Sequence, residues 1–149
     1  MASTTTYDAR LPSVTTTTAN VSHNLPMLSY NSTGWNTFKA DFINTILLTH
    51  GIMICALQEH FKLKDNLNEL NCFNNYEVFS IPATYKDSNT LHLGRPSGGI
   101  SLIYSHSLCQ FTTRLVCPGS HRVQGLKVDC PESSFLFINT YFPNDSNNK

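Results

Sequence analysis

The chain has 149 residues, of which 40% are hydrophobic and 13% charged, and its ten basic residues balance its ten acidic ones. A chain of this length can form one domain with a real core and bury roughly 70% of its unfolded surface. The zero net charge argues mildly against a dedicated nucleic-acid binder, which usually carries a basic excess. It does not argue against an enzyme whose bound metal ions supply positive charge.

Two further features of the sequence restrict partners and location. The five cysteines form no C-x-x-C pair, which argues against a zinc site. The N-terminus has no apolar signal core, and no stretch approaches the ~20 apolar residues that cross a membrane. We therefore expect an intracellular protein, nuclear or cytoplasmic, with no membrane partner.

The N-terminal segment, residues 1–24, contains the runs Thr4–Thr6 and Thr15–Thr18 and almost no large apolar side chains. Such a segment cannot bury enough surface to offset its ordering entropy, so we predict a disordered leader. The ordered domain is predicted over residues 25–149.

A strand, a helix and a second strand are predicted at the start of this domain. Leu25–Tyr30 has the pattern of a short strand, and apolar residues spaced by three and four predict a helix over Thr37–His50. Asn36 or Thr37 can cap that helix. The continuous apolar run Ile52–Leu57 is typical of a central strand buried on both faces, which gives a βαβ-like unit.

Strands dominate the remainder of the chain. A short helical stripe spans Leu63–Leu70, and the strands predicted after it are Tyr76–Ile81, Gly98–Tyr104, Cys109–Val116, His121–Asp129 and Ser134–Tyr141. The last of these is nearly all apolar, so we predict a second buried central strand. Helix and strand alternating, followed by several strands in succession, favour a mixed sheet of the α/β (α+β) class.

Polar side chains follow three of these strands. Glu59 comes directly after the buried run, at the rim where ligands bind in open α/β sheets, and carboxylates are ligands that Mg²⁺ prefers. Asn31 follows the first strand and shares that rim if the two strands are parallel. Tyr141 ends the last strand and can donate to a phosphate oxygen. Taken singly, Glu59 is explained better as an exposed carboxylate, Asn31 as a loop amide and Tyr141 as a core aromatic.

The order and spacing of four phrases are more specific than any one residue. The phrases are Y-N-x-x-G-W, I-x-I-x-A-L-Q-E-H, G-R-P-S-G-G-I-S-L-I-Y and F-x-F-I-N-T-Y-F-P-N-D. Over about residues 27–145 this series resembles the endonuclease/exonuclease/phosphatase family, and within it most resembles the endonuclease domains that accompany reverse transcriptases in non-LTR retrotransposons. The resemblance implies the N-terminal half of a DNase I-like four-layer α/β sandwich that cleaves phosphodiesters with Mg²⁺ (or Mn²⁺).

The resemblance also implies residue roles, with DNA as the partner of the parent protein. Glu59 corresponds to the metal ligand, and Asn31 and Tyr141 to catalytic residues near the scissile phosphate. Asn144 and, more loosely, Arg95 correspond to nucleic-acid contacts. We do not count His60 as catalytic, because its side chain should point away from Glu59 if the strand continues.

The sequence departs from the family pattern in its last residues. Nothing resembles the later S-D-H motif, and Asp145-Ser146-Asn147 has the letters of D-x-N but stands too close to Tyr141. We therefore expect a truncated domain whose partner is its missing C-terminal half, inactive alone and prone to associate through an uncovered apolar sheet face. Two alternatives stay open: an RNA- or small-phosphoester-cleaving phosphatase of the same superfamily, and a non-catalytic interaction module.

Overall fold

The structure, a computed structural model, describes residues 25–85 and 95–142. The predicted leader and Asn144 lie outside the described residues. The elements are β1 (Met27–Asn31), α1 (Thr37–Thr49), β2 (Ile54–Gln58), the 3₁₀ segment η1 (Lys64–Leu70), β3 (Tyr76–Ile81), β4 (Ile100–Ser105), the 3₁₀ segment η2 (His106–Phe111), β5 (Thr112–Val116), β6 (Val123–Cys130) and β7 (Ser133–Thr140). Their order confirms the mixed α/β class. In the described part of the chain, no helix is long and apolar enough to cross a membrane.

The first sheet has the strand order β1-β2-β4-β3. β1 pairs with β2 in parallel, with Asn31 opposite Gln58, while β4 runs antiparallel to both of its neighbours. The condition for Asn31 and Glu59 to share one rim, a parallel pairing of the first two strands, is thus met. A parallel pair needs a crossover connection, and α1 supplies it.

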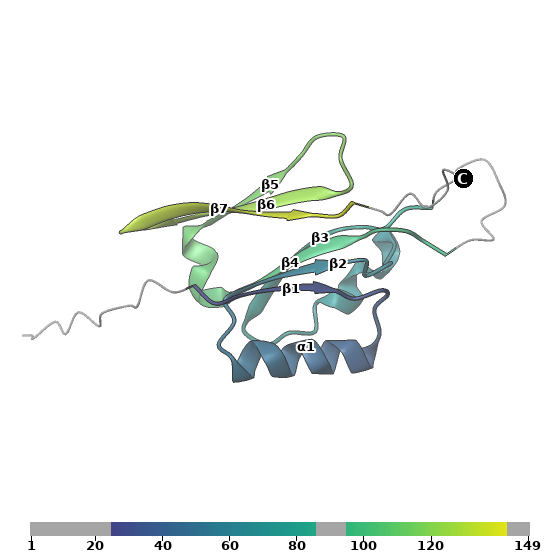
Figure 1. Cartoon of the computed structure of the whole chain (residues 1–149), viewed down its shortest axis with the longest axis horizontal. Helices are drawn as coiled ribbons and strands as arrows, with labels where there is room; N and C mark the ends of the chain where they lie inside the picture. The colour runs from purple at the N-terminus through teal and green to yellow at the C-terminus, as the bar shows by residue number, and fades with distance from the viewer. Residues whose placement is uncertain (1–24, 86–94, 143–149) are drawn as a thin grey trace, which may run out of the picture.

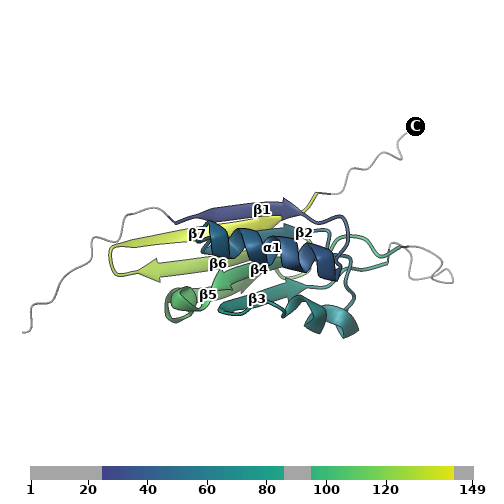
Figure 2. The ribbon, with the colours of Figure 1, turned by 90° about the horizontal axis from the view of Figure 1, so that it is seen from below.

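The first sheet is covered on both faces (Figures 1 and 2). On one face Ile43 and Leu47 of α1 pack into a core with Leu57 of β2. The Asn36 side chain caps this helix by accepting from the Lys39 amide at 2.9 Å. On the other face β2 and β4 pack against the second sheet, so the side chains on both faces of β2 are buried. That environment explains the continuous apolar run in the sequence.

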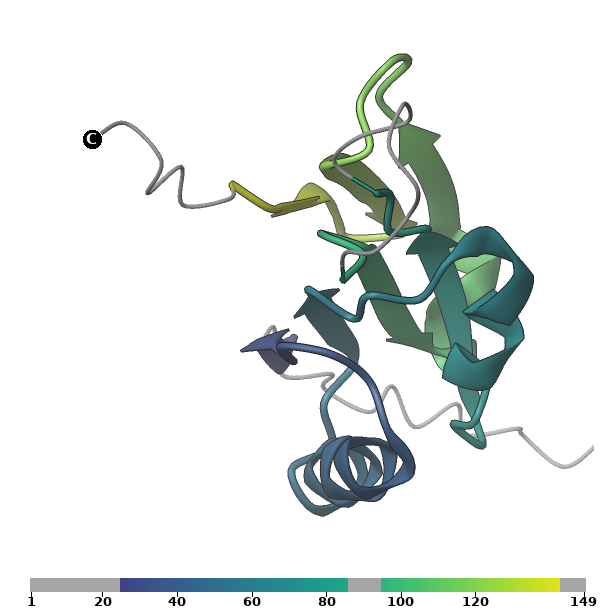
Figure 3. The ribbon, with the colours of Figure 1, turned by 90° about the vertical axis from the view of Figure 1, so that its right-hand side faces the viewer.

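The second sheet is antiparallel, with the order β5-β6-β7. Its inner face carries Leu126 and Val128 of β6, which pack with Ile54 and Leu102 of the first sheet. Figure 3, which views α1 end-on, shows the helix, the first sheet and the second sheet as successive layers.

Two strand predictions need correction. Ser134–Tyr141 is not a buried central strand: in the described residues β7 pairs only with β6, and its side chains alternate between the inner and outer faces. Leu136 and Ile138 point outward and are 54% and 55% exposed. The run looked central because both faces carry apolar side chains. The predicted strand Cys109–Val116 begins only at Thr112, because its first residues belong to η2.

Candidate active site

Strand ends from both sheets meet at one edge of the molecule, which we call the rim. β1, β2, β3, β5 and β7 end there, and β4 and β6 begin there (Figures 1 and 3). The chain leaves β2 sharply, because Glu59 adopts a left-handed backbone with φ of 55°. The Glu59 carbonyl accepts a hydrogen bond from the Gly34 amide at 2.6 Å. This bond ties the loop after β2 to the loop after β1, so Glu59 and Asn31 share the rim.

The Asn31 side chain shapes the loop that follows β1. Its amide oxygen accepts from the Thr33 backbone N–H at 3.0 Å and from the Thr33 hydroxyl at 3.2 Å. Lys39 of α1 holds the same loop by donating to the carbonyl of Ser32 and, at 2.9 Å, to that of Gly34. No described residue accepts a hydrogen bond from the Asn31 amide nitrogen, so this group can donate to a ligand.

Tyr141 follows β7 and lies beside Glu59. Partial burial raises the pKa of the Tyr141 hydroxyl, and the neighbouring Glu59 carboxylate raises it further. The phenol therefore stays protonated at neutral pH and can act as a hydrogen-bond donor. Its backbone N–H donates to the Arg122 carbonyl at 3.0 Å, which anchors the end of β7 to the start of β6. Glu59 and Tyr141, 82 positions apart in the chain, are thus neighbours.

Arg95 lies at the side of the rim next to the β1 loop. Its guanidinium stacks over the Phe61 ring at 4.1 Å and donates to the Thr33 carbonyl at 2.9 Å. The residue is exposed. Because a guanidinium carries five N–H donors, these contacts leave some available for a phosphate.

His60 is buried beneath the rim. β2 ends at Gln58, so the strand does not continue through His60 as the sequence-based argument assumed. The His60 amide donates to the Gly99 carbonyl at 3.3 Å, and its Nδ1 accepts from the Lys62 amide at 3.0 Å. The imidazole lies so close to Gly99 that an added Cβ there would stand 2.5 Å from it. Burial lowers the pKa of His60 to about 4, so the ring is neutral at physiological pH.

A buried amide joins the two sheets behind the rim. Asn139 of β7 donates to the carbonyls of Leu57 at 3.2 Å and Ser101 at 3.0 Å, and it accepts from the Gln58 side chain at 2.8 Å. Sequence reasoning gave neither Asn139 nor Gln58 a role, although both stand in the family-like phrases. The available signal was the position of Asn139, a polar amide that follows the apolar run of this strand in the sequence.

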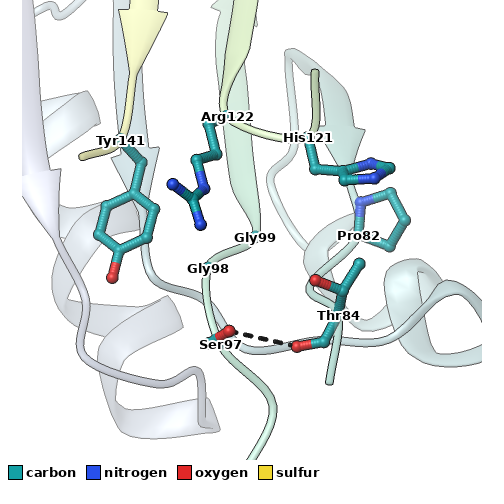
Figure 4. A pocket seen from close by; sticks show the side chains of 8 residues that line it. All are labelled: Pro82, Thr84, Ser97, Gly98, Gly99, His121, Arg122 and Tyr141. Carbon is teal, nitrogen blue, oxygen red and sulfur yellow. Dashed lines mark hydrogen bonds between the residues drawn. The ribbon is translucent and has the colours of Figure 1, made fainter. Parts of the chain in front are cut away.

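A pocket of about 70 Å³ opens at the rim on the other side of Tyr141 (Figure 4). Its lining residues come from four chain segments and are Pro82, Thr84, Ser97, Gly98, Gly99, His121, Arg122 and Tyr141. In Figure 4 the Arg122 guanidinium extends between the Tyr141 ring and the two glycines. Arg122 was not among the predicted site residues, because no local sequence pattern marks it.

The donor set at the rim fits a divalent metal only in part. Among residues 25–85 and 95–142, no three His, Cys, Asp or Glu side chains are placed to hold a metal ion. Mg²⁺ in phosphate-processing sites commonly takes one or two carboxylates and completes its shell with water and substrate phosphate. A single Glu59 carboxylate on the same rim as the Asn31 amide is compatible with such an open shell and not with a closed protein cage.

Comparisons with known proteins give structural matches only: no protein-family model and no curated protein matches the sequence. An AP endonuclease from Leishmania major superposes with a TM-score of 0.61 and 15% identity, over 79% of this chain and 40% of that one. An endonuclease/exonuclease/phosphatase family protein from Leptotrichia buccalis gives 0.53 and 12%, over 82% and 56%. The endonuclease domain of TRAS1, a telomere-specific non-LTR retrotransposon, gives 0.45 and 12%, over 78% and 44%.

The fold assignment rests on the first two of these matches, both with a TM-score above 0.5. At this level of identity they establish the fold and not the activity. The chain spans about half the length of the structures that it matches. About four fifths of this chain therefore has the DNase I-like fold of the endonuclease/exonuclease/phosphatase proteins. The matched part corresponds to about half of each of those structures.

Proposed function

We propose that this chain supplies the metal-binding part of a Mg²⁺-dependent (or Mn²⁺-dependent) phosphodiester-cleaving site that nicks DNA. The observation that carries the proposal is the convergence of Glu59, Asn31 and Tyr141 on one rim of this fold. The retrotransposon type rests on the sequence phrases L-Q-E-H and Y-F-P-N.

Each rim residue has a distinct proposed task. When bound, Mg²⁺ would polarise the phosphate and offset the charge that develops on it. The Glu59 carboxylate binds this ion. The Asn31 amide N–H and the Tyr141 hydroxyl donate hydrogen bonds to the phosphate oxygens. Arg95 and Asn144, the latter outside the described residues, contact the nucleic-acid backbone.

We further propose that cleavage requires the second half of the domain. The family's later D-x-N and S-D-H motifs orient the attacking water and act on the phosphate, and the 149 residues contain no counterpart placed like them. The chain would then bind metal and substrate weakly and cleave only when joined to, or paired with, that half.

A titration with Mn²⁺ tests the central assignment without needing turnover. Free Mn²⁺ gives a six-line paramagnetic resonance signal that fades on binding, and the wild-type chain should bind one ion. Glu59→Gln should abolish this binding. The matched control is Glu132→Gln, which makes the same change in the exposed turn between β6 and β7, at the end of the molecule opposite the rim. Equal Mn²⁺ binding by the two variants would contradict the assignment of Glu59 as the metal ligand.

Cleavage assays then separate the remaining possibilities. In a preparation that nicks supercoiled plasmid, Glu59→Gln should lower the rate by about 10²–10³, the usual cost of losing one charge-stabilising group. The zero net charge favours the alternative of an RNA- or small-phosphoester-cleaving phosphatase. Plasmid, RNA and a small phosphoester assayed side by side distinguish these. No turnover of any of them, with or without the second half, would leave the non-catalytic interaction module.

A further inference from the structure

The pocket beside Tyr141 has the chemistry of an anion site. In the described part of the chain, the residues that line it include Arg122, His121, Thr84, Ser97 and Tyr141, and no Asp or Glu. Gly98 and Gly99 form part of its wall, both with left-handed backbones, at φ of 75° and 83°. A Cβ at Gly98 would stand 3.6 Å from the Tyr141 ring and one at Gly99 would meet the His60 imidazole, so the two glycines let these side chains pack against the pocket wall.

Among the described residues that line the pocket, Arg122 is the one with a permanent charge, and no described acidic residue pairs with it. In the described residues its guanidinium makes no hydrogen bond and no ion pair, and the residue is exposed. Arg114, by contrast, is engaged by Tyr104 at 2.8 Å and Glu77 at 3.0 Å. A fork of N–H donors held over a pocket without an acidic partner matches a phosphate group.

The position of Tyr141 relates this pocket to the proposed metal site. The same side chain lines the pocket on one side and lies against the Glu59 carboxylate on the other. A phosphate held at Glu59 and one held at Arg122 would therefore be near neighbours. Successive phosphates of a nucleic-acid strand satisfy that arrangement, whereas a small monophosphate ester offers only one.

We propose that the Arg122 pocket binds a second phosphate of a DNA strand whose neighbouring phosphate lies at Glu59. This inference rests on the proposed function, and it deepens it by naming the residue that holds the neighbouring phosphate of the DNA strand. Arg122 acts as a binding residue that positions the strand, not as a catalytic group.

The test measures binding without metal or cleavage. The 149-residue chain is titrated into a fluorescein-labelled 12-base-pair DNA duplex in EDTA, and anisotropy gives the affinity at several KCl concentrations. Each phosphate contact contributes about −0.9 to the slope of log K against log salt. Arg122→Gln should weaken binding and reduce the slope by about one. The control Lys127→Gln removes the same charge from the outer face of β6, where Lys127 pairs with Asp129 at 2.9 Å, and should keep the wild-type slope.

Three outcomes would overturn the inference. A wild-type slope in Arg122→Gln would mean that Arg122 makes no phosphate contact. A loss of similar size in both would mean that only total charge matters. In the third outcome, millimolar inorganic phosphate displaces the duplex from wild type and not from Arg122→Gln, while both proteins bind the duplex equally well without it. That result would mean that the pocket takes a lone phosphate. Both variants should melt like wild type, since both residues are exposed.

The two proposals fail separately. Unchanged Mn²⁺ binding in Glu59→Gln removes the metal assignment and leaves the salt slope of Arg122 untouched. An unchanged slope in Arg122→Gln removes the second phosphate and leaves the metal titration untouched.

Discussion

The two sheets of this protein are both apolar, but they are covered differently. In the first sheet the strand β2 has four of its five residues buried, because α1 covers one face and the second sheet the other. In the second sheet β7 buries its inner side chains, while Leu136 and Ile138 stay more than half exposed. The rim that carries Glu59 is therefore built on the part of the fold with the most complete packing. The outer face of the second sheet, with Leu136 and Ile138, is apolar, and no described residue covers it.

The largest difference between the two faces should appear in leucine truncations on adjacent strands. Leu126 is fully buried on the inner face of β6, whereas Leu136 on β7 points outward. Leu126→Ala should cost about 2–5 kcal/mol of unfolding free energy, because it removes buried methyl groups and leaves a cavity. Leu136→Ala should stay within about 0.5 kcal/mol. Urea unfolding followed by circular dichroism measures both, and similar costs would show that the outer face is covered in solution.

A second, somewhat smaller effect should follow from pH at the rim. Burial lowers the folded-state pKa of His60 from 6.5 to about 4, so between these values the unfolded chain binds the proton more readily than the folded one. Stability is therefore full above about pH 6.5 and falls as the pH drops towards 4, by about 3 kcal/mol.

Variants at two histidines isolate this contribution. His60→Gln should flatten the dependence of unfolding free energy on pH between 6.5 and 4, whereas His50→Gln, which alters an exposed histidine after α1, should leave it as in wild type. Parallel losses in wild type and His60→Gln would show that another group titrates in this range. Chemical denaturation at intervals of half a pH unit resolves the curves.

The smallest effect on stability should come from charging the outer face, where the readout is association. Leu136→Lys combined with Ile138→Lys should change the unfolding free energy little, because both side chains are already exposed. It should lower self-association of the chain in sedimentation velocity experiments, since exposed apolar patches promote contacts between molecules. Phe38→Lys on α1, a side chain 78% exposed, is the control and should leave association unchanged. A wild-type chain that sediments as a monomer would contradict the expected association.

The first third of the fold could be predicted from the sequence because its signals are local. The helix over Thr37–Thr49 follows from apolar spacing and the Asn36 cap, and β2 follows from one continuous run. The parallel pairing that places Asn31 next to Gln58 needed only the assumption that these two strands adjoin. Glu59 at the rim followed from that assumption.

What the sequence did not reveal depends on contacts between distant segments. The run in β7 carries apolar residues on both faces, and only tertiary structure shows which face is covered. Arg122 has no local pattern, because its place in the pocket is set by the pairing of β6 with β7 and by the approach of Gly98. The left-handed turn at Glu59 likewise depends on the Gly34 amide, 25 positions earlier.

The amide of Asn139 has a consequence for how the two sheets find their alignment. A slip of β7 by one residue would exchange its faces and bring Ile138 or Thr140 to that position. Ile138 could offer no hydrogen bond, and the short Thr140 hydroxyl has one proton for the two carbonyls, of Leu57 and Ser101, that Asn139 serves. Gln124 of β6 is also buried in this mostly apolar interface, but Asn139 is the residue whose hydrogen bonds select the register of β7. It rejects wrong stackings that a purely apolar interface would tolerate, and so fixes the distance between the strand that delivers Tyr141 and the strand that delivers Glu59.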